Sequence, residues 1–281
     1  MIIVDILSRI LGRQRTWQLG RRLYMIGRGE VVNDIASNGE AELMRRASRA
    51  FAERGAVGTF RAFDVGANMG KWTEYMLAAA RDAGVTARVD AFEPIDAAHA
   101  ALAARFAGNA AVVLHKTAVS DHVGEAEMFV AGETAGTNSL LPVAADAIGR
   151  QVVPLTDIPT VMDELAVATI NLLKIDAEGH DFTILRGILP KFRSGAVEVV
   201  QFEYNWRWLV NGASLRSVFD LISALDYEVG LMEGSEVQLF DWSFEIDRFF
   251  ERNYVIVRSD MVAALGARRL RWNENNLLVP A

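Results

Sequence analysis

The sequence predicts an α/β fold in which a mostly parallel sheet is covered by helices on both faces. Short apolar runs alternate with stretches of helical periodicity from residue 60 almost to the C-terminus, a pattern typical of strand–helix–strand units. The run from residue 170 to 175 is nearly continuous in apolar residues, as expected for a central strand that is buried on both faces. No internal repeat or low-complexity segment interrupts the alternation.

The N-terminal 30 residues differ from the rest in charge. They carry six arginines against Asp5 and Glu30, a net charge of +4 that leaves −11 for the other 251 residues. Helical spacing is found among the apolar residues Ile2, Ile3, Ile6, Leu7, Ile10 and Leu11, with Arg9, Arg13 and Arg15 beside or just after them. We expect a helix docked on the body of the protein. Contact of residues 1–30 with an anionic membrane surface or with a partner subunit is the alternative, because a basic amphipathic helix suits both.

A second helix is expected over residues 40–54, so residues 1–55 form a helical extension and residues 56–281 form the α/β domain. The predicted strands span residues 60–65, 88–93, 111–117, 125–130, 170–175, 197–203, 227–232 and 253–258. The predicted helices of the domain span residues 70–82, 96–106, 157–165, 181–190 and 214–225. Residues 131–156 are rich in glycine, proline and polar residues. We expect them to be an insertion that forms a lid over the carboxyl edge of the sheet.

Composition narrows the class of protein. With 51% hydrophobic and 23% charged residues, the chain can bury a full core. It contains no cysteine, which excludes disulfides, thiolate metal sites and cysteine nucleophiles. The net charge of −7 argues against a nucleic-acid binder. No apolar run reaches the roughly 18 residues of a membrane span, and the first residues lack the order of a signal peptide, so a cytoplasmic protein is expected.

A glycine-containing turn follows the first predicted strand. The segment reads Phe63-Asp64-Val65-Gly66-Ala67-Asn68-Met69-Gly70, and Glu93 follows 23 residues after Gly70, at the end of the next strand. Glycines allow the backbone to approach a ligand closely, and an acid at the tip of the second strand accepts hydrogen bonds from ribose hydroxyls. The G-x-x-x-G spacing differs from the G-x-G-x-x-G of dinucleotide sites. The pattern therefore indicates S-adenosylmethionine, which has no pyrophosphate.

A cluster of ionisable residues follows the predicted central strand. Asp176, Glu178 and His180 lie within five residues of one another, and ligands bind beyond the carboxyl ends of strands in open α/β sheets. Groups so close together perturb one another's pKa, so all three are candidate catalytic residues. The alternatives are that Asp176 caps the next helix and that His180 is a surface residue.

The chain resembles the FkbM-type S-adenosylmethionine-dependent methyltransferases. The resemblance rests on the segments FDVGANMGKWT (63–73), FEP (92–94), AVSDHVGEAEM (118–128), TNSLLP (137–142) and LLKIDAEGHDFTILRG (172–187). It extends from about residue 60 to 205. It implies a class I, Rossmann-like methyltransferase fold with a seven-stranded, mostly parallel sheet in which the seventh strand is antiparallel. It also implies a hydroxyl of a sugar or natural product as the small-molecule acceptor.

The resemblance also implies the roles of individual residues. The turn that holds the methionine end of the cofactor matches Asp64, Gly66, Asn68 and Gly70, and the ribose-binding acid matches Glu93. No acid stands near Thr117-Ala118, where many class I enzymes bind the adenine amino group. Adenine recognition is therefore assigned to backbone groups or to Ser120 and Asp121.

The acceptor hydroxyl has to lose its proton, which requires a base or a metal ion. Asp176 and His180 are the candidate bases; we favour a route without metal, in which His180 removes the proton and Asp176 orients the hydroxyl. In the alternative, Asp176 with Glu178 or Glu203 holds Mg²⁺. The acceptor itself is assigned to Asn138, Glu203 and Trp206. The aromatic residues after the strand 197–203 can stack on a sugar or simply pack in the core.

Other functions are less consistent with the sequence. A nucleotide-dependent oxidoreductase would require G-x-G-x-x-G and a catalytic Tyr-x-x-x-Lys, and both are absent. N-methylation is the first alternative, although the Asn/Asp-Pro-Pro-Tyr motif of amino-group enzymes is also absent. A scaffold that binds S-adenosylmethionine without turnover is the second. A homo-oligomer is compatible with all of these.

Overall fold

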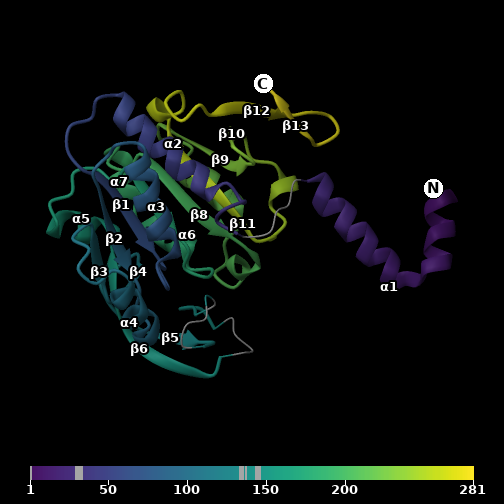
Figure 1. Cartoon of the computed structure of the whole chain (residues 1–281). Helices are drawn as coiled ribbons and strands as arrows, with labels where there is room; N and C mark the ends of the chain where they lie inside the picture. Colours follow the sequence, from purple (N-terminus) through teal and green to yellow (C-terminus); the bar gives the residue numbers. More distant parts are fainter. Residues whose placement is uncertain (1, 29–33, 133–135, 137, 143–146) are drawn as a thin grey trace.

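The structure is a computed structural model, described here for residues 2–28, 34–132, 136, 138–142 and 147–281. Parts of the predicted insertion (133–135 and 143–146), Thr137 of the TNSLLP segment, Met1 and residues 29–33 lie outside the described residues. Figure 1 shows a twisted central sheet, with the N-terminal helix extending away from it.

Ten strands form the central sheet in the order β13-β12-β10-β9-β11-β8-β7-β1-β2-β3. In chain order they are β1 (Phe60–Val65), β2 (Ala87–Phe92), β3 (Val112–His115), β7 (Leu172–Ile175), β8 (Val199–Tyr204), β9 (Tyr227–Glu233), β10 (Glu236–Leu239), β11 (Arg252–Arg258), β12 (Arg268–Trp272) and β13 (Leu278–Pro280). Strands β3, β2, β1, β7 and β8 pair in parallel, and β11 is antiparallel to both β8 and β9. The predicted antiparallel seventh strand is therefore present.

The prediction of a seven-stranded sheet is wrong in its strand number. The hairpin of β9 and β10, followed by β12 and β13, adds three strands beyond β9. These strands are short and partly exposed, with burial alternating along β10 and little burial along β12. Because each is only three to five residues long, its apolar period was too brief to be recognised in the sequence.

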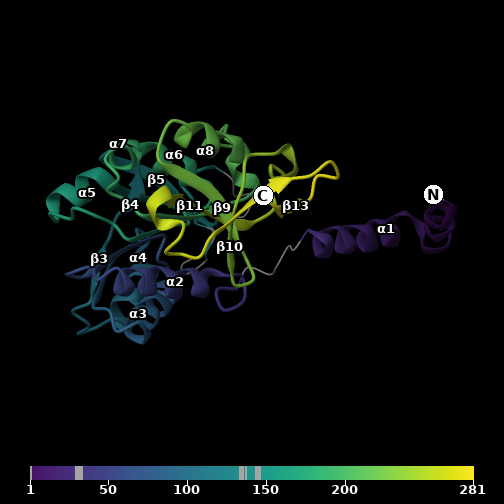
Figure 2. The ribbon, with the colours of Figure 1, turned by 90° about the horizontal axis from the view of Figure 1, so that it is seen from above.

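Helices cover both faces of the central sheet, as predicted (Figure 2). One face is covered by α2 (Glu40–Glu53), α3 (Lys71–Asp82) and α4 (Asp96–Arg105), and the other by α5 (Ile158–Glu164), α6 (Asp181–Gly187), α7 (Leu189–Arg193) and α8 (Leu215–Ile222). The larger core cluster joins α5–α8 to one face of the sheet, including Phe63, Leu173 and Phe202. The second joins α2 and α3 to the other face, including Phe60 and Leu172. The predicted helix 181–190 is divided into α6 and α7, with Pro190 near the start of α7.

A second, three-stranded sheet lies beside the main one. It consists of β4 (Ala118–Ser120), β6 (Gly149–Asp157) and β5 (Gly124–Val130) in that spatial order. The end of the predicted insertion is therefore the strand β6, which pairs along the whole of β5. The composition of residues 131–156 concealed this strand, because Pro154 and the polar residues around it are unusual within a strand.

The extension predicted over residues 1–55 has two parts with different environments. Helix α2 belongs to the folded body, since Leu43, Met44 and Phe51 lie in the core with α3. The buried carboxylate of Glu40 accepts a hydrogen bond from Gln201 Nε2 at 2.6 Å. Helix α1 (Ile2–Gly27) instead projects away from the body in both views (Figures 1 and 2). We therefore place the start of the folded body near Asp34 rather than at residue 56.

Among the described residues, no helix combines the length and apolar character that crossing a membrane requires.

Candidate active site

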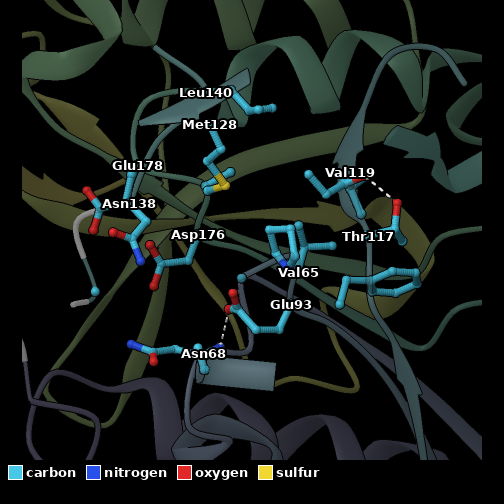
Figure 3. Close-up of a pocket in the computed structure, with 17 residues that line it drawn as sticks. Val65, Asn68, Glu93, Thr117, Val119, Met128, Asn138, Leu140, Asp176 and Glu178 are labelled. Carbon is cyan, nitrogen blue, oxygen red and sulfur yellow. Dashed lines mark hydrogen bonds between the residues drawn. The ribbon is translucent and has the colours of Figure 1, made fainter. Parts of the chain in front are cut away.

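A cavity with a volume of about 100 Å³ opens at the carboxyl ends of β1, β2 and β7. Figure 3 shows Glu93, Asn68 and Asp176 on one side of this space and Met128 and Leu140 on another. The complete lining consists of Val65, Gly66, Asn68, Phe92, Glu93, Pro94, Ala98, Thr117, Ala118, Val119, Met128, Gly136, Asn138, Leu140, Asp176, Ala177 and Glu178. Its position matches the ligand site expected for an open α/β sheet.

The turn after β1 depends on glycine at its first position. Gly66 has φ of 73° and approaches β7 so closely that a Cβ atom would lie 2.0 Å from the carbonyl oxygen of Asp176. Asn68 also has a positive φ of 46°, a conformation that asparagine tolerates better than most residues. The side-chain oxygen of Asn68 is buried and has no hydrogen-bond partner among the described residues. Both Gly66 and Asn68 of this turn line the cavity.

Gly70 and Asp64 stabilise the turn through packing and polar contacts, and neither lines the cavity. Gly70 precedes α3 with φ of 77°, and a Cβ atom there would lie 2.4 Å from the ring of Phe106. Asp64 is completely buried. Its carboxylate accepts a hydrogen bond from the Thr73 hydroxyl at 2.6 Å and lies 3.2 Å from Lys174 Nζ.

Lys174 was not assigned a role from the sequence, yet it contacts both the turn after β1 and Asp176, which follows β7. Its ammonium group lies between Asp64 and Asp176, at 3.2 Å and 3.5 Å, and donates to the carbonyl oxygen of Gly66 at 2.9 Å. The register of the parallel pair places Asp64 directly beside Lys174. A lysine within a nearly continuous apolar run was the available signal, because a buried lysine requires a charged partner.

Glu93 lies at the end of β2, where the sequence predicted it, and lines the cavity. Its two carboxylate oxygens accept hydrogen bonds from the backbone N–H groups of Asn68 and Ile95, each at 2.9 Å. The first of these bonds ties Glu93 to the glycine turn (Figure 3). Burial raises the pKa of Glu93, and the two backbone donors oppose that shift. Each carboxylate oxygen retains a lone pair with which it can accept a hydrogen bond from a hydroxyl group.

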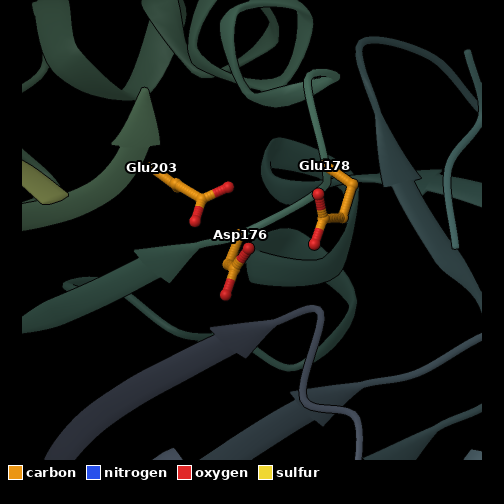
Figure 4. Close-up of side chains that lie close together, drawn as sticks. All are labelled: Asp176, Glu178 and Glu203. Atoms are coloured by element: carbon orange, nitrogen blue, oxygen red, sulfur yellow. The ribbon is translucent and has the colours of Figure 1, made fainter. Parts of the chain in front are cut away.

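Three carboxylates converge where β7 and β8 end (Figure 4). The last paired residues of the two strands are Ile175 and Phe202, so the residues that follow, Asp176 and Glu203, leave neighbouring strands at the same level. With Glu178 they offer oxygen atoms that lie within 4.8 Å of one another. Asp176 and Glu178 line the cavity, whereas Glu203 is buried behind them. The convergence that spacing alone could not show is therefore present.

Cationic and amide groups surround these carboxylates. Lys174 lies beside Asp176, Arg207 Nη1 lies 2.9 Å from a carboxylate oxygen of Glu178, and Asn205 Nδ2 donates to Glu203 at 2.6 Å. Burial nevertheless raises the pKa of Glu178 to about 8, with the charge of Asp176 adding to the effect and Arg207 opposing it. Burial also raises the pKa of Glu203, again with Asp176 adding to the shift.

Asp181 stabilises the loop that carries this cluster. Its buried carboxylate accepts hydrogen bonds from the backbone N–H groups of Ala177 and Gly179 at 3.1 Å and 3.0 Å. Burial raises the pKa of Asp181 to about 7. The sequence analysis did not assign Asp181, although an acid in the first turn of a helix is a common partner for backbone N–H groups.

These raised pKa values predict that the protein loses stability as the pH rises. For Glu178, the contribution is fully present below pH about 4.5 and is lost as the pH rises to about 8, because the native state holds the proton more tightly. We expect Glu178→Gln to melt a few °C above the wild-type protein at pH 8.5 and close to it at pH 5. Thermal unfolding followed by circular dichroism would measure both. Glu125→Gln, on the exposed part of β5, is the control. An identical pH dependence in Glu178→Gln and the wild-type protein would contradict the assignment.

His180, which the sequence analysis favoured as the base, lies outside the cavity lining. Its Nε2 lies 2.9 Å from the Ser120 hydroxyl, and Nδ1 is buried without a hydrogen-bond partner among the described residues. Burial lowers the pKa of His180 to about 4, so the ring is neutral at physiological pH. The sequence of residues 176–180 did not reveal that the side chain of His180 points toward β4 and away from the carboxylates of Asp176 and Glu178.

Ser120 and Asp121, assigned to adenine, also lie outside the cavity lining. Asp121 pairs with Arg186 and His122 at 2.7 Å and 2.8 Å, and these hydrogen bonds lower its pKa to about 2 against the effect of burial. The preceding residues, 117–119, line the cavity instead. Their location agrees with the alternative in which backbone groups recognise adenine.

The three residues assigned to the acceptor have different positions. Asn138 lines the cavity, and its side-chain oxygen accepts a hydrogen bond from the N–H of Ala131 at 2.9 Å. Trp206 is exposed and does not line the cavity, and Arg207 lies over its ring. Glu203 belongs to the carboxylate cluster. The aromatic residues Tyr204 and Trp208 pack in the core.

The described part of the insertion contributes to the cavity lining. Met128 on β5 and Gly136, Asn138 and Leu140 from the insertion belong to its lining. The neighbouring Ser139 hydroxyl donates to the carbonyl oxygen of Glu178 at 2.8 Å. The insertion is thereby joined to the loop that carries the carboxylates.

The order of the strands, with antiparallel β11 between β8 and β9, agrees with the fold that the resemblance to methyltransferases implies. The model of the Methyltransferase FkbM domain matches residues 64–229. The chain belongs to this family. A comparison with curated proteins finds no match.

Several solved structures show a distant similarity to this chain. A methyltransferase FkbM from Methylobacillus flagellatus is 13% identical, with a TM-score of 0.44 over 75% of this chain and 47% of that one. A SAM-dependent methyltransferase from Agrobacterium tumefaciens is 11% identical, with a TM-score of 0.40 over 78% and 61%. A putative O-methyltransferase from Klebsiella pneumoniae is 14% identical, with a TM-score of 0.39 over 92% and 96%. This chain therefore spans about half the length of the first and less than two thirds of the second.

Proposed function

We propose that this protein transfers the methyl group of S-adenosylmethionine to a hydroxyl of a small molecule such as a sugar or natural product. The observation that carries the proposal is that Glu93 and Asp176 line one cavity, together with Gly66 and Asn68 of the turn after β1. A candidate ribose-binding acid and an acid that can accept a proton thereby share one cavity.

The lining suggests how the cofactor is held. Glu93 accepts hydrogen bonds from the ribose hydroxyls, and the turn with Gly66 and Asn68, which also lines the cavity, holds the methionine moiety. The apolar wall formed by Phe92, Met128 and Leu140 receives the adenine ring, which binds through stacking and dispersion. Asp64 supports the turn through Lys174 and does not contact the ligand.

The reaction is an in-line displacement at the methyl carbon. The acceptor oxygen forms a bond to that carbon, the carbon–sulfur bond breaks, and the electron pair remains on the neutral thioether of S-adenosylhomocysteine. The hydroxyl proton passes to Asp176, whose side chain is the most exposed carboxylate of the cluster. The protein contributes alignment of the two reactants and exclusion of water, together with the base.

We favour proton transfer without a metal ion, although Asp176, Glu178 and Glu203 offer the oxygen ligands that Mg²⁺ prefers. The positive charges of Lys174 and Arg207 lie beside Asp176 and Glu178, which weakens the attraction of the cluster for a dication. Activity that is indifferent to EDTA is therefore expected. Activity lost in EDTA and restored by Mg²⁺ would assign the cluster to a metal. At pH 8.5, Mg²⁺ would then also raise the melting temperature, because it would bind the ionised carboxylates of the native state.

Two other functions are distinguished by experiment. In N-methylation the acceptor would be an amine, and the acid cluster would receive no proton from a hydroxyl. A scaffold would bind the cofactor without turnover. Calorimetry with S-adenosylmethionine should show binding at one site, and incubation with labelled cofactor and a panel of glycosides and phenolic or polyketide alcohols should give a labelled ether. Label found on amines alone would favour N-methylation. Binding without labelled product on any alcohol or amine would favour the scaffold.

A further inference from the structure

Helix α1 leaves a set of apolar side chains without cover. It projects from the body in both views (Figures 1 and 2), and Trp17, Leu23 and Ile26 are 61%, 60% and 75% exposed. Its contacts with the body come from its C-terminal end, where the Tyr24 hydroxyl accepts a hydrogen bond from Arg248 and Arg28 pairs with Glu245. The expectation that this helix docks along the body is therefore wrong for these residues.

The exposed part of α1 is amphipathic. Gly12 interrupts the helix with non-helical φ and ψ of 71° and 161°. The faces of the segment after Gly12 are therefore independent of those of the segment before it. At 100° per residue, one half of its surface carries Trp17, Leu19, Leu23, Tyr24 and Ile26, with Arg13 between them. The other half carries Gln14, Arg15, Gln18, Arg21 and Arg22, with Met25 between them. The apolar half matches what a helix lying in a lipid interface buries.

The positive charge of α1 favours binding to an anionic surface. Residues 9–28 contain six arginines and no acidic residue, whereas residues 31–281 carry a net charge of −11. Two copies of this arm would repel one another if they paired. An anionic surface attracts the arm and repels the body, which allows the arm alone to make contact. Long arginine side chains can also extend their guanidinium groups to lipid phosphates while their stems lie along the apolar face.

We propose that α1 binds the surface of anionic phospholipid membranes, lying in the interface without crossing it. The absence of a helix able to cross a membrane among the described residues agrees with this orientation. The sequence of residues 2–11 is also mostly isoleucine, leucine and valine. The active-site cavity lies on the body and takes no part in this contact, so the proposal is independent of the proposed methyl transfer.

The test is co-sedimentation of the full chain with vesicles of phosphatidylcholine alone or of phosphatidylcholine mixed with phosphatidylglycerol. Binding should require phosphatidylglycerol and should weaken as NaCl is raised. The variant Arg15→Gln/Arg21→Gln/Arg22→Gln should lower the partition coefficient on anionic vesicles by about 10²-fold, since each arginine near such a surface contributes about fivefold. Trp17→Ser/Leu23→Ser should weaken it as well, through lost apolar burial.

The matched control changes three exposed arginines of the body, Arg49→Gln/Arg81→Gln/Arg193→Gln, and should bind vesicles like the wild-type protein. All variants should keep the wild-type melting temperature, because the altered side chains lie outside the core. Equal loss of binding in the two triple variants would overturn the proposal, as would failure of the wild-type protein to bind anionic vesicles. A dimer in sedimentation velocity that depends on the arm, without lipid binding, would assign α1 to a second copy instead.

Discussion

Replacing Asp176 with asparagine is expected to lower turnover by a factor on the order of 10² or more while cofactor affinity changes little. Asparagine keeps the size of the side chain but cannot accept the hydroxyl proton. The backbone of Asp176 packs against Gly66, and this contact survives the substitution, so the cofactor turn should keep its shape. Steady-state kinetics with an identified acceptor, together with calorimetry for S-adenosylmethionine, would measure both quantities.

Two companion variants sharpen this prediction. Asp163→Asn, which removes an exposed carboxylate on α5, should retain wild-type turnover. His180→Gln should retain turnover within a few-fold, because His180 lies outside the cavity lining. In the wild-type protein, the pH–rate profile should show no rise attributable to His180 near pH 6.5, since the pKa of this residue is lowered to about 4. Full turnover in Asp176→Asn would show that the proton acceptor has been placed on the wrong residue. A large loss in His180→Gln with unchanged stability would return the role to histidine.

Replacing Glu93 with alanine is expected to weaken binding of S-adenosylmethionine by roughly 30- to 150-fold. Loss of charge-assisted hydrogen bonds to the ribose hydroxyls costs about 2–3 kcal/mol. The substitution also frees the backbone N–H groups of Asn68 and Ile95, which Glu93 now holds. Glu93→Gln should lose less affinity, because the amide oxygen can still accept one hydrogen bond. Calorimetry with S-adenosylmethionine and S-adenosylhomocysteine would rank the three proteins.

A control is needed because Glu93 also holds the turn. Glu74→Gln changes an exposed acid on α3 that pairs with Arg105 outside the cavity and should bind the cofactor normally. If Glu93→Ala folds with a melting temperature near that of the wild-type protein and binds with unchanged affinity, the ribose assignment is refuted.

The local sequence was sufficient to predict the order and type of most central elements. Strand β1 begins and ends at the predicted residues, and the helices after β1, β2 and the small sheet begin within one residue of the predicted positions. These segments are long enough for their apolar period to be unambiguous. Short strands at the C-terminus and the strand β6 escaped recognition, because their formation depends on neighbours that are distant in the sequence.

For the site, the sequence by itself determined which residues stand at the ends of the strands. A turn with Gly66 and an acid at position 93 place polar groups beyond the carboxyl edge of any parallel sheet built from these segments, and Asp176 follows the central strand for the same reason. The tertiary structure decided which of these groups share a space. The pairing of β1 with β7 places Lys174 beside Asp64, and the pairing of β7 with β8 brings Asp176 to Glu203.

The tertiary structure also separated residues that the sequence places together. His180 lies two residues from Glu178, but its ring contacts Ser120 while Glu178 faces Arg207, because the loop after β7 reverses direction at Glu178 and Gly179, both with positive φ. Likewise, the arginines and apolar residues of α1 predicted a helix, and only the fold showed that the body leaves its apolar half exposed. Helical periodicity specifies which side chains share a face, whereas the partner of that face depends on where the rest of the chain can bury apolar surface.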